Sequence, residues 1–150
     1  MQLGTGTYDL LIGYSLSQKN DDISWGTQIK YKRSLNDNNG WHFGNKLEVS
    51  SWLSYLWNEE FSSAIRFLAI DEDSIDGNDS LITGRNPSQE TANYGGRSYY
   101  LGFSLNIVGQ DEQIRGHRLA LEFLTPLKQD LNGLQMEKGN SLIIAYQKAW

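Results

Sequence analysis

Six charged residues occupy alternate positions in segments where polar and apolar residues alternate. They are Lys30, Lys32, Glu48, Arg66, Arg118 and Glu122. Successive side chains of a strand point to opposite faces, so these charges belong to polar faces that lie opposite apolar ones. Inside a lumen they must pair or form hydrogen bonds, because an isolated charge away from water is costly. We expect them to face such a lumen, either as a salt-bridge network that holds the wall together or as charges that select solutes.

The other candidates for chemistry are weaker. A run of acidic residues could offer oxygen ligands to calcium, but its spacing does not match an EF-hand and favours a solvated loop. It comprises Asp71, Glu72, Asp73, Asp76 and Asp79. The two histidines, His42 and His117, fall in separate segments, and no G-x-S-x-G nucleophile motif is present. The sequence therefore predicts no catalytic residue, no enzyme activity, no metal site and no cofactor.

The composition narrows the class of protein. The chain has 150 residues, with 13 Lys and Arg against 18 Asp and Glu and a net charge of −5. It has no basic stretch that could match a run of phosphates, so no nucleic-acid partner is expected. No apolar run approaches the roughly 20 residues of a membrane-spanning helix, whereas a membrane strand needs only about 9 to 11 alternating residues. The length suits one domain, residues 1–150.

Period-2 alternation predicts an all-β fold. The expected strands are residues 8–17, 23–32, 46–55, 61–69, 98–107, 116–123 and 142–150. Glu48 and Arg66 fall on consecutive strands and are expected to be neighbours. A helix across residues 52–69 is the alternative for the fourth segment, because its apolar residues also fit i, i+3, i+4 spacing. Residues 71–96 have no sustained period and are expected to form a long loop that is the most mobile segment and lies on the extracellular side.

Two all-β architectures fit this alternation, a soluble barrel or sandwich and a membrane barrel. The face opposite the apolar residues favours the second, because it is rich in the small and polar residues of a crowded lumen. The connections also alternate in length, as in bacterial membrane barrels. The short ones are 18–22, 57–60 and 109–113, and the longer ones are 34–41, 71–96 and 126–139. We therefore expect an antiparallel, up-and-down transmembrane β-barrel segment of about seven strands, and an incomplete barrel.

The same pattern assigns a direction to the side chains. Aromatic residues collect near strand ends, where the interfacial girdles of a membrane barrel would lie. They are Trp41, Tyr55, Trp57, Tyr99 and Trp150. The apolar face is expected to meet lipid, and a register change of one residue would reverse every side chain. Its predicted members are Leu10, Ile29, Val49, Ile65, Phe103, Leu121 and Ile144.

Several segments resemble a known family. The opening GTGTYDLLIGYSLS, the segment IDGNDSLITGRNP followed by GGRSYYLGFSLNIV, and the stretch LEFLTPLKQDLNGLQMEKGNSLIIAYQKAW look like the C-terminal half of outer-membrane proteins of the meta-pathway phenol-degradation transporter type. The resemblance implies transport of small aromatic or hydrophobic molecules. The chain departs from the family at Ser80, where IDGxDP is frequent. It also resembles outer-membrane proteins in ending on an aromatic residue, Trp150, with Tyr146 and Ile144 in phase, which implies a C-terminal assembly signal.

These observations together predict an outer-membrane channel or transporter for small molecules. The expected location is the bacterial outer membrane, and the expected partners are the lipid bilayer, the outer-membrane assembly machinery and a small-molecule solute. An odd strand count leads us to expect the C-terminal portion of a longer barrel, with its signal peptide outside this chain. The alternative is a soluble β-barrel or sandwich that binds a small apolar ligand. A weaker alternative is an outer-membrane hydrolase that uses a Ser/His pair.

Overall fold

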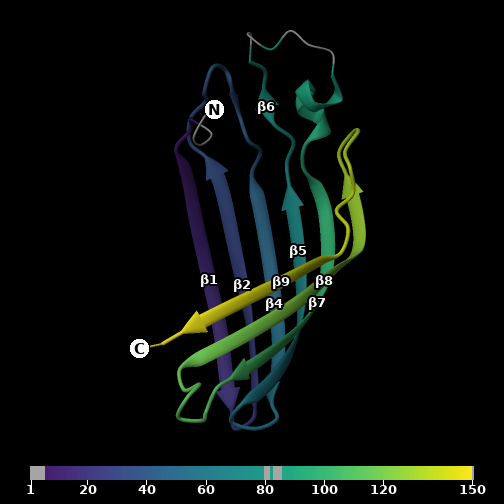
Figure 1. The fold of residues 1–150 in the computed structure, drawn as a ribbon. Helices are drawn as coiled ribbons and strands as arrows, with labels where there is room; N and C mark the ends of the chain where they lie inside the picture. Colours follow the sequence, from purple (N-terminus) through teal and green to yellow (C-terminus); the bar gives the residue numbers. More distant parts are fainter. Residues whose placement is uncertain (1–5, 80–81, 83–85, 150) are drawn as a thin grey trace.

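The computed structural model of the chain describes residues 6–79, 82 and 86–149, and it is built around one large antiparallel sheet (Figure 1). The sheet has seven strands in the order β1-β2-β4-β5-β7-β8-β9. Their bounds are β1 Asp9–Asn20, β2 Ile23–Ser34, β4 Lys46–Leu56, β5 Phe61–Glu72, β7 Gly96–Val108, β8 His117–Leu131 and β9 Ser141–Lys148. Each strand pairs with the next of the seven along the chain, which is an up-and-down meander.

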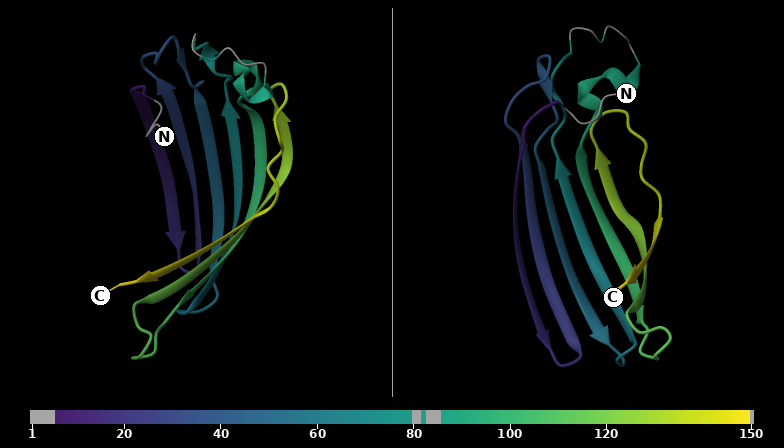
Figure 2. Two further views of the ribbon diagram at one scale, coloured as in Figure 1. Left: turned by 45° about the horizontal axis from the view of Figure 1, so that its top comes forward. Right: turned by 60° about the vertical axis from the view of Figure 1, so that its left-hand side comes forward.

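The sheet curls but does not close on itself. β8 and β9 swing across the direction of β1 and β2, so the sheet forms a trough (Figures 1 and 2). In the part of the chain that the structure describes, β1 and β9 are the two edges and do not pair with each other. The prediction of an all-β, antiparallel, up-and-down fold of about seven strands in an unclosed barrel is therefore confirmed.

The two faces of the sheet differ sharply in composition. Cross-strand pairs such as Ile29↔Val49 and Ile65↔Phe103 put apolar side chains beside each other on one face. Val49 is half-buried, but Ile29, Ile65 and Phe103 remain exposed, and Phe103 keeps 50% of its surface open. Among the described residues, Tyr100 on the opposite face is the one buried apolar side chain, at 5% exposure. The usual arrangement of a soluble sheet, with its apolar face covered, is absent from the described chain.

The structure corrects several predicted boundaries. The helix alternative for residues 52–69 is wrong, because this stretch forms the β4–β5 hairpin in which Leu53 is paired with Ile65. The predicted connection 126–139 is wrong in its first part, where β8 continues to Leu131. Pro126 sits in this strand next to a register shift at Tyr99/Tyr100, the kind of irregularity that accommodates proline in a sheet.

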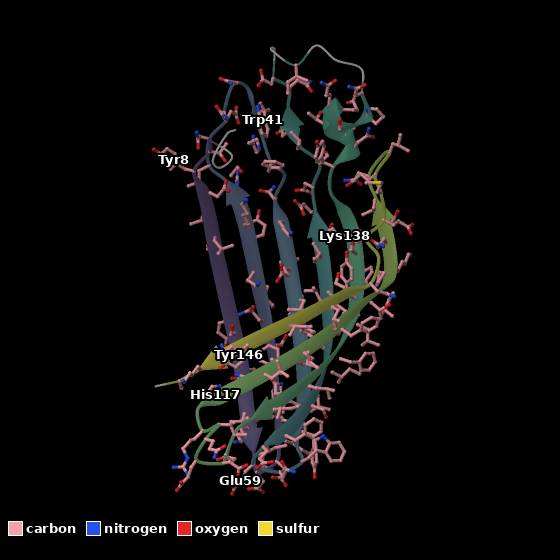
Figure 3. The ribbon with its side chains drawn as sticks, viewed as in Figure 1. Tyr8, Trp41, Glu59, His117, Lys138 and Tyr146 are labelled. Carbon is pink, nitrogen blue, oxygen red and sulfur yellow. The ribbon has the colours of Figure 1, made fainter. Side chains whose placement is uncertain are left out.

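The connections at the two ends of the sheet differ in length. Residues 21–22, 57–60 and 109–116 join strands at one end, whereas residues 35–45, the described part of 73–95 and residues 132–140 lie at the other (Figure 1). In Figure 3, Glu59 marks the first end and Trp41 marks the second. The alternation of shorter and longer connections expected from the sequence is present, although 109–116 and 132–140 differ little in length.

The predicted loop 71–96 contains more structure than expected. Asp71 and Glu72 end β5, and Gly96 begins β7. Between them lie β6 Asp76–Gly77 and the short 3-10 helices η1 Pro87–Gln89 and η2 Thr91–Asn93. β6 pairs with β3 Trp41–His42 and so joins two connections. The mobility and extracellular position of this segment stay predictions, and residues 80, 81 and 83–85 lie outside the described residues.

The helical elements are short. Both η1 and η2 have three residues. Over the described ranges, the structure contains no helix with the length and apolar character needed to cross a membrane.

Candidate functional site

All six charges singled out from the sequence lie on the polar face of the sheet. Lys30 is directly opposite Glu48, and Arg66 is directly opposite Gly102. Glu122 is opposite Ser104, and Arg118 stands an even number of residues before it on β8. One pocket on this face is lined by side chains from five consecutive strands of the sheet, β4, β5, β7, β8 and β9. The outer two of these strands, β4 and β9, are not paired with each other, so the sheet must curve to bring them to one pocket. The polar face is therefore the concave side of the trough.

A layer of ion pairs crosses this face on the side of the longer connections. Lys32 Nζ lies 2.8 Å from Asp9 Oδ2, and Lys30 Nζ lies 2.6 Å from Glu48 Oε1. A third pair, Lys46–Glu72, joins β4 to β5 at 3.2 Å. Each pair connects adjacent strands, so these charges strengthen the wall of the trough as well as making its surface polar.

Arg66 pairs across an intervening strand. Its Nη2 lies 2.7 Å from Glu122 Oε1, although Arg66 is on β5 and Glu122 is on β8. The residue between them on β7 is Gly102, and a Cβ there would lie 3.0 Å from Glu122 Oε1. The absence of a side chain at Gly102 leaves room for this contact. The predicted contact between Glu48 and Arg66 is not formed, because their carboxylate and guanidinium pair with Lys30 and Glu122 instead.

Arg118 differs from the other charges because its observed partner is neutral. Its Nη2 donates a hydrogen bond of 2.7 Å to Asn106 Oδ1 on β7. In the portion of the chain described by the structure, no carboxylate lies within ion-pair distance of Arg118. Its positive charge is therefore left uncompensated on the concave face.

Trp52 is the residue of this site that the sequence analysis did not single out. It lies on the polar face of β4, directly opposite Gly26 on β2. A Cβ at Gly26 would lie 2.3 Å from Trp52 Cζ2, so the indole ring covers the space above this glycine. The available signal was a large aromatic residue out of phase with the apolar face and paired with a glycine, an arrangement that protects a glycine in a sheet.

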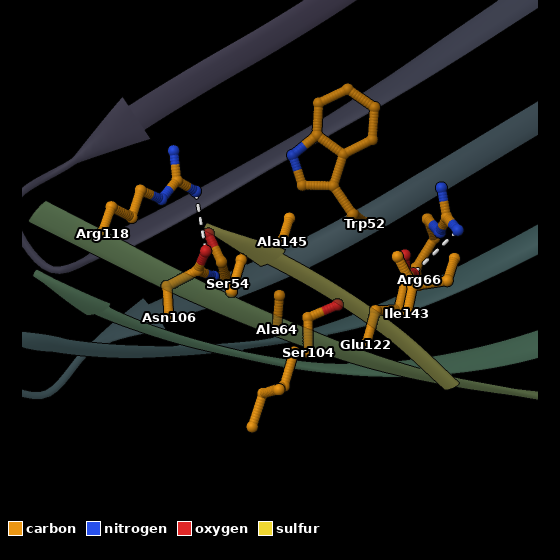
Figure 4. A pocket seen from close by; sticks show the side chains of 12 residues that line it. Trp52, Ser54, Ala64, Arg66, Ser104, Asn106, Arg118, Glu122, Ile143 and Ala145 are labelled. Atoms are coloured by element: carbon orange, nitrogen blue, oxygen red, sulfur yellow. Dashed lines mark hydrogen bonds and ion pairs between the residues drawn. The ribbon is translucent and has the colours of Figure 1, made fainter. Parts of the chain in front are cut away.

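These side chains line an open pocket of about 400 Å³ on the concave face (Figure 4). Its charged and aromatic lining consists of Arg66, Arg118, Glu122 and Trp52. In the view of Figure 4, the two arginines stand on opposite sides of the pocket and the indole of Trp52 lies between them. Ala64, Ala120, Ala145 and Ile143 add apolar surface. The pocket thus combines two guanidinium groups, one carboxylate and one large aromatic ring.

The residues of the predicted assembly signal lie on the edge strand β9. Ile144 is opposite Leu121 and Tyr146 is opposite Leu119, so both belong to the apolar face. The Tyr146 hydroxyl lies 2.5 Å from His117 Nδ1, and the two residues are labelled near each other in Figure 3. Trp150, the third member, lies outside the described residues.

Aromatic rings gather at both ends of the sheet. Tyr55 and Trp57 make an edge-to-face contact with ring centres 4.8 Å apart at the end of the short connections. Trp57 Nε1 donates a hydrogen bond of 2.9 Å to Ser63 Oγ. At the opposite end, Trp41 and Phe43 make a similar contact at 5.4 Å. The expected gathering of Trp41, Tyr55 and Trp57 near strand ends is therefore present, and an interfacial role for these rings stays a prediction.

The acidic run and the histidines show other contacts. Asp71 Oδ2 lies 3.1 Å from Arg97 Nε, Glu72 pairs with Lys46, and Asp73 accepts a hydrogen bond from an asparagine side chain. His42 Nδ1 lies 2.7 Å from Asp37 Oδ1. Over the described ranges, no three acidic or histidine side chains gather as a metal site would require.

Comparisons of this chain with protein-family models, curated proteins and solved structures gave no match. The function of the chain is therefore inferred from the geometry of the two faces of the sheet.

Proposed function

We propose that this chain forms part of the wall of a bacterial outer-membrane β-barrel channel or transporter for small molecules. The observation that carries the proposal is the exposed apolar face, which extends over all seven strands of the sheet. Ile29 on β2, Ile65 on the central strand β5 and Ile144 on the edge strand β9 keep 45%, 42% and 64% of their surfaces open. A patch of this extent is unfavourable in water but matches the lipid-facing band of a membrane barrel.

The concave face supports the same proposal. It carries ion pairs and small polar residues, which suit a water-filled interior. The soluble alternative, a barrel or sandwich that binds a small apolar ligand, would need the reverse arrangement, with apolar side chains inside and polar ones in water. Six of the seven strands are also long enough, because they have 11 to 15 residues each and a membrane strand needs about 9 to 11, whereas β9 has 8.

The solute and the absence of catalysis are parts of the proposal as well. Small aromatic or hydrophobic molecules are the solute class that the family resemblance implies. No enzyme activity is proposed. Over the described ranges, the hydrogen bonds of the two histidines involve Asp37 and Tyr146 and not a serine, which weakens the hydrolase alternative.

Membrane association is the property to test first. The purified chain in detergent should be diluted below the critical micelle concentration with and without phospholipid vesicles. We expect it to float with the vesicles, to resist protease in its strands, and to aggregate when vesicles are omitted. The same chain kept in urea before and during dilution controls for non-specific adhesion. A monodisperse chain that stays in solution without detergent and does not float would refute the proposal.

A further inference from the structure

We infer that the pocket beside Trp52 binds a small aromatic carboxylate, with Arg118 holding the carboxylate and Trp52 contacting the ring. This inference rests on the proposed function, because it takes the concave face as the path of the solute, and it deepens that function by naming the solute class.

The net charge of the pocket favours a ligand that carries a single negative charge. Arg66 is neutralised by Glu122 at 2.7 Å, whereas Arg118 has, among the described residues, only the neutral Asn106 as its partner. Two guanidinium groups and one carboxylate leave the lining with one positive charge in excess. A monoanion would balance this charge, and a neutral solute would leave it uncompensated.

The donor geometry favours a carboxylate. A guanidinium group presents five N–H donors in a planar fork that matches the two oxygens of a carboxylate. One Nη2 donor of Arg118 is directed to Asn106. This hydrogen bond orients the fork and leaves its remaining donors for a ligand. Arg118 is also exposed, so a solute in the trough can reach it.

The rest of the pocket favours a ligand with an aromatic ring. The indole of Trp52 is fixed above Gly26, and a planar ring can pack against it face to face with an offset or edge to face. Ala64, Ala145 and Ile143 supply further apolar contact. The volume of about 400 Å³ lies within the range of roughly 300 to 1,000 Å³ of small-molecule pockets. An aromatic carboxylate combines the charge that Arg118 requires with the ring that Trp52 can contact.

The test is equilibrium binding of benzoate to the full chain in nonionic detergent, measured by isothermal titration calorimetry. Benzyl alcohol keeps the ring without the charge, and acetate keeps the charge without the ring. We expect benzoate to bind more tightly than both, and its affinity to fall as the salt concentration rises.

The decisive variants change one guanidinium at a time. Arg118→Gln should weaken benzoate binding by about tenfold or more, because it removes a charge-assisted contact. Arg118→Lys should lie between this variant and the unchanged chain, since it keeps the charge and loses the fork. Arg115→Gln, in the exposed 109–116 connection, is the matched control and should change the affinity by less than about twofold. Circular dichroism verifies that each variant keeps its strands.

The outcomes separate this inference from the proposed function. Equal benzoate affinity in the Arg118→Gln and Arg115→Gln variants, or no benzoate binding by the unchanged chain, overturns the inference even if the chain floats with vesicles. Arg118-dependent binding by a chain that does not float keeps the binding site and refutes the membrane function. Tighter binding of benzyl alcohol than of benzoate also overturns the inference of an aromatic carboxylate ligand, because the preferred solute would then be neutral.

Discussion

Placing an arginine on the apolar face of β5, and removing one from its concave face, should distinguish lipid from water on the convex side. Ile65 lies in the middle of β5 on the apolar face, between Leu53 on β4 and Phe103 on β7. If this face meets lipid, Ile65→Arg should lower the free energy of unfolding by about 2 to 4 kcal/mol. If it meets water, the substitution is an exposed surface change worth less than about 0.5 kcal/mol.

The neighbouring substitution on the concave face provides the comparison. Arg66→Gln breaks the 2.7 Å contact with Glu122, whose side chain keeps 20% of its surface open. Water can therefore replace part of the lost contact, and we expect a loss of about 1 kcal/mol. A lipid-facing convex side thus makes Ile65→Arg the more damaging substitution, and a water-facing one reverses the order.

The assay is urea unfolding of the vesicle-inserted chain, followed by tryptophan fluorescence. Ser63→Arg, measured against Ser63→Ala, is the matched control, because both remove the hydroxyl that accepts the hydrogen bond from Trp57 Nε1 and only the first places an arginine on the same face nearer the end of β5. The cost of arginine on a membrane strand falls to about 0 to 1 kcal/mol near the interface, so Ser63→Arg should cost less than Ile65→Arg. Equal costs at the two positions, or a larger loss from Arg66→Gln, would refute the assignment of the faces.

Three further predictions concern the concave face and the longest connection. Gly26→Ala should displace the Trp52 indole, because the new Cβ would lie 2.3 Å from Cζ2, and the tryptophan emission should shift. Gly13→Ala is the control: its nearest contact would be at 3.5 Å, so the emission should stay unchanged. Gly102→Val should force apart the ion pair that passes over it and destabilise the inserted chain by about 1 to 3 kcal/mol in urea unfolding. Protease added to intact cells should cut within the connection 73–95 before any strand, and protection equal to that of the strands would mean that this segment is not extracellular.

The strands and their faces were predictable because the period of 2 is a local signal that survives without knowledge of the tertiary structure. Strand ends were predicted less well, since the alternation of apolar residues stops before the hydrogen-bonded ladder does. β5 continues through Asp71 and Glu72, where ion pairs with Arg97 and Lys46 replace apolar contacts across the strands. In β8 the proline at position 126 indicated a connection, whereas the register shift beside it keeps the strand continuous.

The candidate site was predictable in its faces but not in its contacts. Alternation was sufficient to gather six charges on one side of the sheet. The partners of these charges depend on the register between strands. Hairpin geometry determines this register, and it cannot be read directly from the sequence. The contact from Arg66 to Glu122 also needs a glycine on the strand between them, a condition that involves three strands at once. Trp52 was missed because an aromatic residue on a polar face carries no signal until its cross-strand neighbour is known.

The pocket lies beside β9, one of the two unpaired edges of the sheet, so a strand added at this edge would change its surroundings. Every neighbouring pair is antiparallel, so the first and last of the seven strands, β1 and β9, run in the same direction. Direct pairing of these edges would introduce one parallel ladder into an antiparallel sheet, whereas antiparallel closure requires an odd number of additional strands between them. The pocket includes Ile143 and Ala145 of the edge strand β9. Any strand that pairs with β9 therefore extends the wall next to Arg118 and Trp52, excludes water from that side, and strengthens the interaction of the uncompensated guanidinium with an anionic solute.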